Sequence, residues 1–317
     1  MKLPMSVAKL AGWGLALVVL ASLTFVGLQN NAKLFLLTTF NAVTLGAIYF
    51  LVASGFTLVF GLMRIVNLAH GAFFLMGGYV GFAAANAFGT WWLGVAAGAL
   101  GTFVFGWAIY AGIFSRMHGE DLRQTLVSIG LSIVMADIIL WIFGGQTYQF
   151  DVPAVLTQIV KFPVAGNYPG YRLLVVAVAA LITLGLWFLL NRTYFGMLIR
   201  AGVDDKETLQ TSGVNVKRLF ALTFGLGAGL AGLAGVIGGS ALSISPGEDS
   251  RYLLASLIVV ILGGMGSIAG AAVGAILVAV VETFGLVYTP TYSVVFTFVL
   301  MALFLAFRPT GLFGVAK

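Results

Sequence analysis

Two acidic residues lie inside long apolar runs, Asp137 in SIVMADIILWIF and Glu282 in LVAVVETFG. Insertion of an Asp at the centre of a bilayer costs about 2.5–3.5 kcal/mol, so such residues normally face the protein interior or a water-filled cavity. Asp137 is equally suited to a solute or proton site and to a structural hydrogen bond. For Glu282 we favour the structural role, because Tyr288 and Pro290 indicate that its apolar run ends soon afterwards.

A second group of polar residues interrupts the apolar stretch SGFTLVFGLMRIVNLAHG at 54–71. This pattern is typical of neither a plain loop nor a plain membrane span. Glycines and polar groups are tolerated at membrane depth where the backbone lines a cavity or is buried in protein. Asn67 and His70 therefore have two candidate roles: they line a cavity, or they cap the next helix and satisfy a buried carbonyl group.

The segment GAGLAG at 227–232 matches the dinucleotide-binding pattern G-x-G-x-x-G, but it lies inside a long apolar run rather than between a strand and a helix. Glycines four residues apart leave a bare helix face, so we interpret this segment as a surface for close helix packing. The same interpretation applies to the glycines spaced by four at positions 225, 229, 235, 239, 266, 270 and 274. With no cysteine, two histidines and no Gly-Lys-Ser/Thr phosphate loop, we expect no cofactor, no metal and no ATP hydrolysis by this chain.

The composition indicates which elements must hold these residues. The chain has 317 residues, of which 61% are hydrophobic and only 8% are charged, too few charges to coat a soluble domain. The net charge of +6 comes from cations scattered between apolar runs, with no basic stripe that would indicate nucleic acid. Long continuous apolar runs exclude the alternating pattern of a transmembrane barrel. We predict an all-α polytopic membrane protein, a single transmembrane domain over 1–317.

About 20 apolar residues are needed to cross the hydrocarbon layer as a helix, and ten segments approach this length. The glycine-rich stretch GGMGSIAGAAVG (263–274) allows a broken or re-entrant helix instead, so we expect about 8–10 transmembrane helices. We interpret the first segment as an uncleaved span rather than a secretory signal, because it is too long and lacks a clear cleavage site. The predicted spans are 10–29, 35–55, 70–90, 92–114, 124–144, 173–190, 219–240, 252–269, 271–289 and 291–307.

The positive-inside rule predicts that both termini are cytoplasmic. In this orientation 12 of the 16 Lys and Arg residues lie inside, and Lys33, Lys161, Arg172 and Arg251 lie outside. The first and sixth spans then run in opposite directions. A five-plus-five inverted repeat is therefore a geometric possibility, which we hold as a hypothesis.

The cytoplasmic connection 191–218 carries signals for a short helix. Asp204 can act as its N-cap with Glu207 three residues later, and Gly213 can adopt the left-handed conformation that ends a helix. The spacing predicts a helix of about two turns at 205–212. Because so short a helix is unstable alone, either its flanking spans or a docked partner must hold it, unless the loop is simply solvated.

In this same loop the chain resembles the permeases of bacterial ABC importers, whose motif is Glu-Ala-Ala, three residues and Gly. Glu207 and Gly213 have that spacing, although Thr208 and Leu209 replace both alanines. The chain is most similar to the branched-chain amino-acid (hydrophobic amino-acid uptake) permease family. The similar segments are SGFTLVFGLMRIVNLAHGAFFLMGGY (54–79), QTLVSIGLSI (124–133), residues 192–235, VVILGGMGSIAGAAVG (259–274) and FRPTGLFG (307–314).

This resemblance implies a permease subunit, not an enzyme, in the bacterial inner membrane. It would form the path for branched-chain amino acids or related small amino acids, amides or urea in an ATP-driven importer. The implied partners are two cytoplasmic ATPase subunits, a second homologous permease or a second copy of this chain, and a periplasmic substrate-binding protein. The coupling loop 195–218 would engage an ATPase through Asp204, Asp205, Glu207 and Gly213. The outer segment 145–172 would meet the binding protein, or would be a plain solvated connection.

Polar residues inside the spans are our candidates for the solute path, and Ser128 and Ser132 share one helix face because they are four residues apart. Two other functional classes remain open from the residues alone. One is a proton-coupled secondary transporter that uses Asp137 and Glu282, and the other is a membrane scaffold without solute flux. The candidate path residues are Asn41, Thr44, Thr57, Asn67, His70, Ser128, Ser132 and Asp137.

Overall fold

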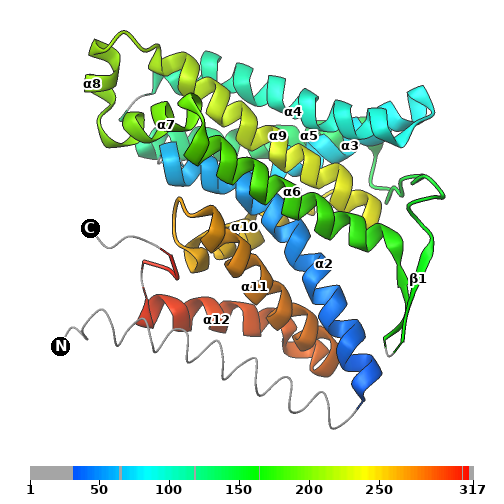
Figure 1. The fold of residues 1–317 in the computed structure, drawn as a ribbon. Coiled ribbons are helices and arrows are strands. Elements are labelled where there is room, and N and C mark those ends of the chain that lie inside the picture. The colour runs from blue at the N-terminus through cyan, green and yellow to red at the C-terminus, as the bar shows by residue number, and fades with distance from the viewer. Residues whose placement is uncertain (1–30, 64–65, 118, 164, 309, 314–317) are drawn as a thin grey trace.

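The computed structural model describes residues 31–63, 66–117, 119–163, 165–308 and 310–313. The predicted first span, 10–29, lies outside them. The described chain is almost entirely helical (Figure 1), which confirms the predicted all-α class. Its elements are α2 (Ala32–Phe56), the π-helix η1 (Thr57–Leu62), α3 (His70–Phe88), α4 (Trp91–Gly112), η2 (Phe114–Arg116), α5 (Asp121–Phe143), β1 (Ile159–Phe162), β2 (Gly166–Pro169), α6 (Gly170–Arg192), α7 (Tyr194–Asp204), α8 (Lys206–Thr211), α9 (Val216–Leu242), α10 (Asp249–Gly263), α11 (Ile268–Tyr288), η3 (Pro290–Tyr292) and α12 (Ser293–Phe307).

Seven helices in the described part of the chain are long and apolar enough to cross a membrane: α2 with η1, α3, α4, α5, α6, α9 and α11. The protein is thus a multi-pass membrane protein. The prediction of a full crossing at 252–269 is wrong, because α10 has 15 residues and ends at Gly263. Such a helix rises only about 22 Å, less than the roughly 30 Å hydrocarbon layer. The predicted span at 291–307 is likewise reduced to the 15 residues of α12.

The glycine-rich stretch after α10 forms a turn, which confirms the alternative of a broken helix. Gly264 and Gly266 have positive φ angles of 100° and 82°, a conformation that residues with a Cβ rarely adopt. Ser267 then caps α11, because its side chain accepts a hydrogen bond of 3.0 Å from the backbone N–H of Gly270. The helix is therefore interrupted and restarted by its own sequence.

Two long helices, α2 and α9, are each followed by an interruption in regular structure. Helix α3 begins after the first interruption and α10 after the second, and the starts of α3 and α10 lie side by side. After η1 the chain returns to start α3 at His70, and after Leu242 an irregular segment leads to α10. A Cβ added to Gly71 would lie 2.0 Å from the backbone oxygen of Asp249, so the starts of α3 and α10 touch. This repeated order of elements favours the hypothesis of a five-plus-five repeat.

Glycines bring α9 into direct backbone contact with its neighbours, which confirms the packing interpretation of GAGLAG. A Cβ added to Gly227 would lie 2.8 Å from the backbone oxygen of Gly55 in α2. One added to Gly232 would lie 2.7 Å from the backbone oxygen of Gly98 in α4, and one added to Gly235 would lie 2.0 Å from that of Phe74 in α3. Close approach of this kind gives membrane helices their packing energy. Helix α9 thus packs directly against α2, α3 and α4 (Figure 1).

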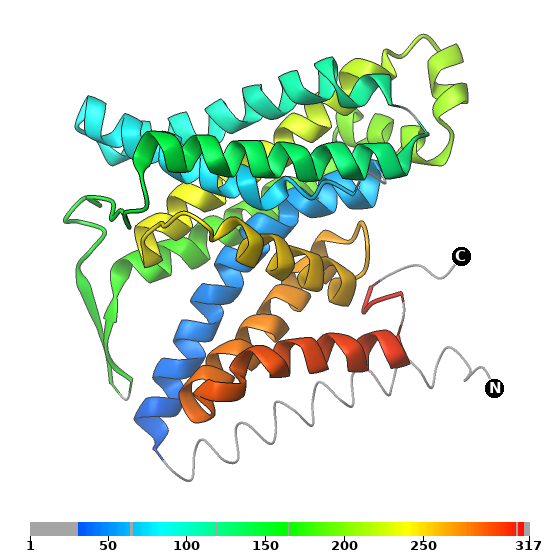
Figure 2. The same ribbon diagram turned by 180° about the vertical axis from the view of Figure 1, so that it is seen from behind.

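Segment 145–172 contains a β-hairpin that the sequence did not lead us to expect. Strands β1 and β2 pair antiparallel, with Ile159 opposite Pro169 and Phe162 opposite Gly166. The hydroxyl of Tyr168 donates to the backbone oxygen of Phe40 at 2.9 Å, which ties the hairpin to α2. Both ribbon views place the hairpin at one end of the molecule and α7 with α8 at the opposite end (Figure 1, Figure 2).

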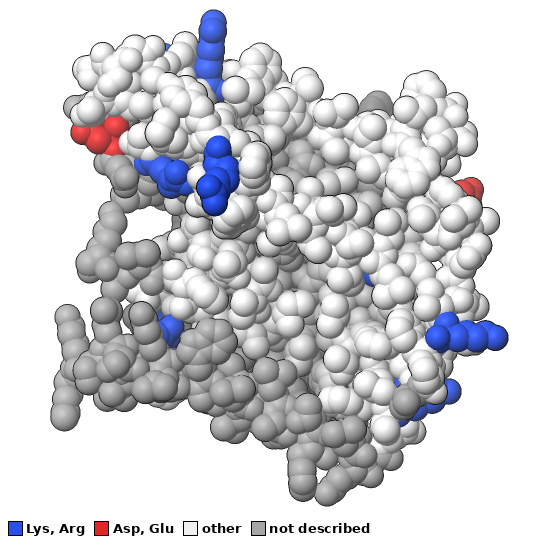
Figure 3. Space-filling model, viewed as in Figure 1, with Lys and Arg blue, Asp and Glu red and all other residues white. Residues whose placement is uncertain are grey.

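Charged side chains lie mainly toward these two ends on the face shown in Figure 3, and a broad uncharged surface separates them. Large apolar side chains such as Leu100, Leu181 and Trp187 are more than half exposed on the helices between the ends. An exposed apolar belt of this kind is what lipid would cover.

We predict that Gly232→Ala weakens the bundle, because the added Cβ would lie 2.0 Å from the hydroxyl oxygen of Thr102. Overpacking of this kind costs about 1–3 kcal/mol, which should lower the midpoint of thermal unfolding in mild detergent by several degrees. Gly185→Ala in α6 is the matched control, because nothing lies within 4 Å of its added Cβ. Equal midpoints for the two variants would contradict the packing assigned to α9.

Candidate functional site

A cleft of about 410 Å³ opens between α5 and the start of α10. This volume lies within the range of small-molecule sites. Its polar groups are Ser132 and Asp137 of α5 and Asp249 and Ser250 of α10, and its walls are otherwise apolar. The lining residues are Leu68, Ile129, Ser132, Ile133, Ala136, Asp137, Asp249, Ser250 and Leu253.

The cleft lies at membrane depth. Ser132 occupies the middle of the 23-residue helix α5, and Asp137 follows little more than one turn later. The Asp137 residue is exposed in the single chain. Because a carboxylate at this depth is costly against lipid, it must meet water or protein. The cleft provides such surroundings, and no ion pair of the described residues involves Asp137 or Asp249.

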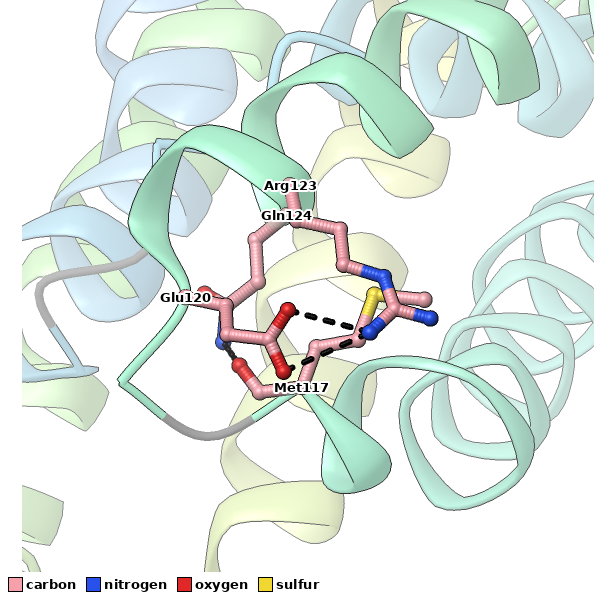
Figure 4. Close-up of polar contacts among 4 residues, drawn as sticks. All are labelled: Met117, Glu120, Arg123 and Gln124. Carbon is pink, nitrogen blue, oxygen red and sulfur yellow. Dashed lines mark hydrogen bonds and ion pairs between the residues drawn. The ribbon is translucent and has the colours of Figure 1, made fainter.

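The turn before α5 fixes the position of this helix (Figure 4). The side-chain amide of the buried Gln124 donates a hydrogen bond of 2.5 Å to the backbone oxygen of Met117. On the outside of the same turn, Arg123 and Glu120 form an exposed ion pair of 3.0 Å. An exposed pair of this kind contributes little stability. The hydrogen bond from the buried Gln124 side chain is therefore the contact that anchors the start of α5.

Hydrogen bonds within the protein hold the segment that leads into α3. The hydroxyl of Ser128 accepts from the backbone N–H of Leu68 at 3.0 Å, and the side chain of Asn67 accepts from the N–H of Ala69 at 3.1 Å. Nε2 of the fully buried His70 lies 2.9 Å from the backbone oxygen of Val52, so Nε2 carries the hydrogen and donates. The three predicted path residues of this group thus come together, and they place Leu68 in the cleft wall.

Three further predicted path residues lie on α2 and η1 and are not among the residues that line the cleft. Asn41 accepts a hydrogen bond from the guanidinium of Arg172, and Thr44 shares a hydrogen bond of 2.7 Å with Tyr168. Thr57 donates to the backbone oxygen of Ala53, one turn earlier, at 2.7 Å. Each of these polar groups is satisfied inside the protein. Of the eight candidates, the cleft brings together Ser132 and Asp137.

Asp249 and Ser250 are cleft residues that the sequence reasoning missed. The dipeptide Pro246–Gly247 followed by two acids is a recognisable signal for a turn and a helix start. The predicted span begins at 252, because the charges of 248–251 interrupt the hydropathy. The helix starts three residues earlier, at Asp249, at the level of the middle of α5.

The connection 191–218 is more ordered than predicted, since it contains two helices. Helix α7, which was not predicted, begins after Thr193, whose hydroxyl accepts from the backbone N–H of Gly196 at 3.2 Å. Helix α8 spans Lys206–Thr211, and its N-cap is Asp205, which accepts from the N–H of Thr208 at 3.0 Å. The prediction of Asp204 as the N-cap is wrong by one residue, because Asp204 ends α7.

The flanking helices hold α8, which answers the question of what stabilises so short a helix. Leu209 is buried, and a Cβ added to Gly202 of α7 would lie 3.2 Å from the Leu209 side chain and 3.3 Å from Phe220 of α9. The Arg200 guanidinium donates to the backbone oxygen of Leu190, joining α7 to α6. Gly213 has a φ of 85°, as expected for the end of a helix.

The fold defines a polytopic membrane protein with an open cleft between α5 and the start of α10. The family model for the branched-chain amino acid transport system permease component matches residues 38–305. The chain belongs to this family. It is a transport permease, not an enzyme, and the proton-coupled alternative for Asp137 and Glu282 is left without support.

Three relatives show the extent of the similarity. The high-affinity branched-chain amino acid transport system permease protein BraD of Pseudomonas aeruginosa is 31% identical over 290 residues, 86% of this chain and 94% of that protein. LivH of Escherichia coli, which has the same description, is 32% identical over 296 residues, 88% of this chain and 96% of its own. The probable branched-chain amino acid transport permease protein LivM of Methanocaldococcus jannaschii is 27% identical over 229 residues, 66% of this chain and 64% of that protein. No solved structure matches the chain.

We predict that Gly213→Val loosens α8, whereas Gly213→Asn does not. Space around the residue is open, so only the left-handed backbone conformation matters. This conformation costs a residue with a Cβ about 1–2 kcal/mol, but Asn adopts it readily. Amide hydrogen exchange over 205–213 should become about five- to thirtyfold faster in Gly213→Val. Equal exchange in both variants would show that Gly213 does not end the helix in this way.

Proposed function

We propose that this chain is the membrane permease of an ATP-driven importer and that branched-chain amino acids cross through the cleft between α5 and α10. The observation that carries the proposal is the chemistry of the cleft. Asp137 and Asp249 can attract the ammonium group of an amino acid, and the apolar walls suit an aliphatic side chain. The descriptions of BraD and LivH as branched-chain amino acid permeases support this substrate class.

A second permease subunit closes the cleft in this proposal. Asp137 and Ser250 are exposed in the single chain, and lipid is a poor neighbour for a carboxylate. A homologous permease, or a second copy of this chain, would cover this face and complete the path. The similarity of the chain to both LivH and LivM relatives favours a related but different partner.

Two ATPase subunits act from the end that carries α7 and α8, which we assign to the cytoplasm. Arg116, Arg192, Arg200, Lys217 and Arg218 all belong to elements at this end, as the positive-inside rule requires. Both termini would then be cytoplasmic, in a bacterial inner membrane. The hairpin at the opposite end is available to a periplasmic binding protein, and its exposed Val160 and Ile159 suit a transient contact.

The packing of α8 suggests how ATP binding moves the bundle. An ATPase that grips α8 pushes on Leu209, which packs close to Phe220 at the start of α9. Helix α9 is in backbone contact with α2, α3 and α4, so its shift reaches the starts of α3 and α10. A ligand shifts a conformational equilibrium only by its differential affinity for the two states, and ATP supplies that difference here.

We predict that Asp137→Asn lowers ATP-dependent leucine uptake at least about tenfold, a loss of about 1.4 kcal/mol of interaction with the ammonium group. Uptake would be measured in proteoliposomes that contain both permeases, the ATPases and the binding protein. Asp121→Asn, at the exposed start of the same helix and outside the cleft lining, is the matched control and should leave uptake unchanged. Full uptake by Asp137→Asn, or uptake that follows a proton gradient without ATP, would contradict the proposal.

A further inference from the structure

An ion pair joins α10 to α11 on the side of α10 that faces away from the cleft. Nη2 of Arg251 lies 3.1 Å from Oε1 of Glu282. The other carboxylate oxygen of Glu282 accepts a hydrogen bond of 2.6 Å from the hydroxyl of Tyr49 in α2. Glu282 therefore has the structural role expected from the sequence, and it connects three helices at once.

Aromatic contacts continue this connection to α3. The ring of Tyr252, the residue after Arg251, stacks on Phe74 with centroids 3.8 Å apart, and it meets Tyr49 edge to face at 6.3 Å. The Arg251 guanidinium lies 5.9 Å from the centroid of the Tyr252 ring. We call the five residues Tyr49, Phe74, Arg251, Tyr252 and Glu282 the clamp. It holds the first turn of α10 against α2, α3 and α11.

The clamp and the cleft use different faces of the same turn. Asp249, Ser250 and Leu253 line the cleft, and their spacing of one and four residues places them on one side of a helix. Arg251 and Tyr252 lie between them in sequence and project from the other side. Because successive residues of a helix are about 100° apart, a rotation of the first turn by less than that angle would already turn Asp249 or Ser250 away from the cleft.

The start of α10 needs such an attachment. The preceding segment is anchored at Ile244, which exchanges two backbone hydrogen bonds with Tyr148, but between Ile244 and Asp249 the chain forms only turns, which do not fix the rotation of α10. Tyr49 and Tyr252 are almost fully buried, and Phe74 is 1% exposed. Tight packing of this kind has discrete arrangements rather than continuous ones.

We propose that the clamp is a positioning device for the solute path: it sets the rotation of α10 so that Asp249 and Ser250 face Asp137 across the cleft. This inference rests on the proposed function of the cleft. Glu282 is the better buried partner, with 24% of its side chain exposed against 51% for Arg251, and its other oxygen already holds the hydroxyl of Tyr49, so loss of its charge releases Arg251 from α11. Exchange of the two charges restores a pair.

The chain contains no cysteine, so a single introduced thiol reports on one position. The test uses Ser250→Cys in the assembled importer, in membrane vesicles, and measures its reaction rate with a membrane-impermeant, positively charged methanethiosulfonate. Addition of Glu282→Gln should slow this reaction at least tenfold and reduce leucine uptake in parallel. The double exchange R251E with E282R should bring the rate back to within about threefold of the Ser250→Cys chain.

Glu120→Gln is the matched control, because it breaks the exposed Arg123–Glu120 pair far from α10 and should change neither readout. If Glu282→Gln leaves the thiol reaction rate unchanged, or if the double exchange folds but does not restore that rate, the positioning role of the clamp is wrong while the proposed function of the cleft stands. If Glu282→Gln does not assemble, Tyr49→Phe replaces it, with a smaller slowing expected and an unchanged rate again overturning the clamp. An unreactive thiol in Ser250→Cys itself would overturn the water-filled cleft and with it the proposed function.

Discussion

A helix that starts inside a bilayer leaves backbone N–H groups that only protein or water can satisfy, and this constraint shapes the molecule. Helices α3 and α10 both start at the level of the middle of α5. Side chains of Asn67, His70 and Ser128 bond to backbone groups around the first of these starts. At the second start the polar groups face a cleft. The same constraint therefore explains the polar residues around the start of α3 and the polar cleft at the start of α10.

Close helix packing links the cleft to the end of the molecule that carries α7 and α8. Helix α9 has enough glycines to touch α2, α3 and α4 through backbone atoms, so these helices move together rather than slide on flexible side chains. At the start of α9, Phe220 packs near Leu209 of α8. The clamp ties α10 to α2, α3 and α11 at the other end of the chain of contacts. In the proposed mechanism, a push on the loop 195–218 reaches the cleft through these contacts.

The sequence predicted the helices well and the site only in part. Hydropathy sums over about 20 residues, so spans such as 70–90 fall close to the observed His70–Phe88. A cap depends on one hydrogen bond, and the sequence predicts Asp204 as the N-cap of α8 where the structure has the adjacent Asp205. Polarity within a span marked Thr57, whose hydroxyl serves its own helix. Asp249 lies 112 positions after Asp137 in the chain, and only the fold shows that they share a cleft.

The central claim is that water and solute reach the middle of α5, and thiol labelling of Ser132→Cys in the assembled importer tests it most directly. We expect a membrane-impermeant reagent to modify this thiol and expect leucine, supplied with its binding protein, to slow the modification. Leu181→Cys, at the exposed centre of α6, should stay unmodified because lipid covers it. An unmodified Ser132→Cys, or one whose rate leucine leaves unchanged, would show that the solute takes another route.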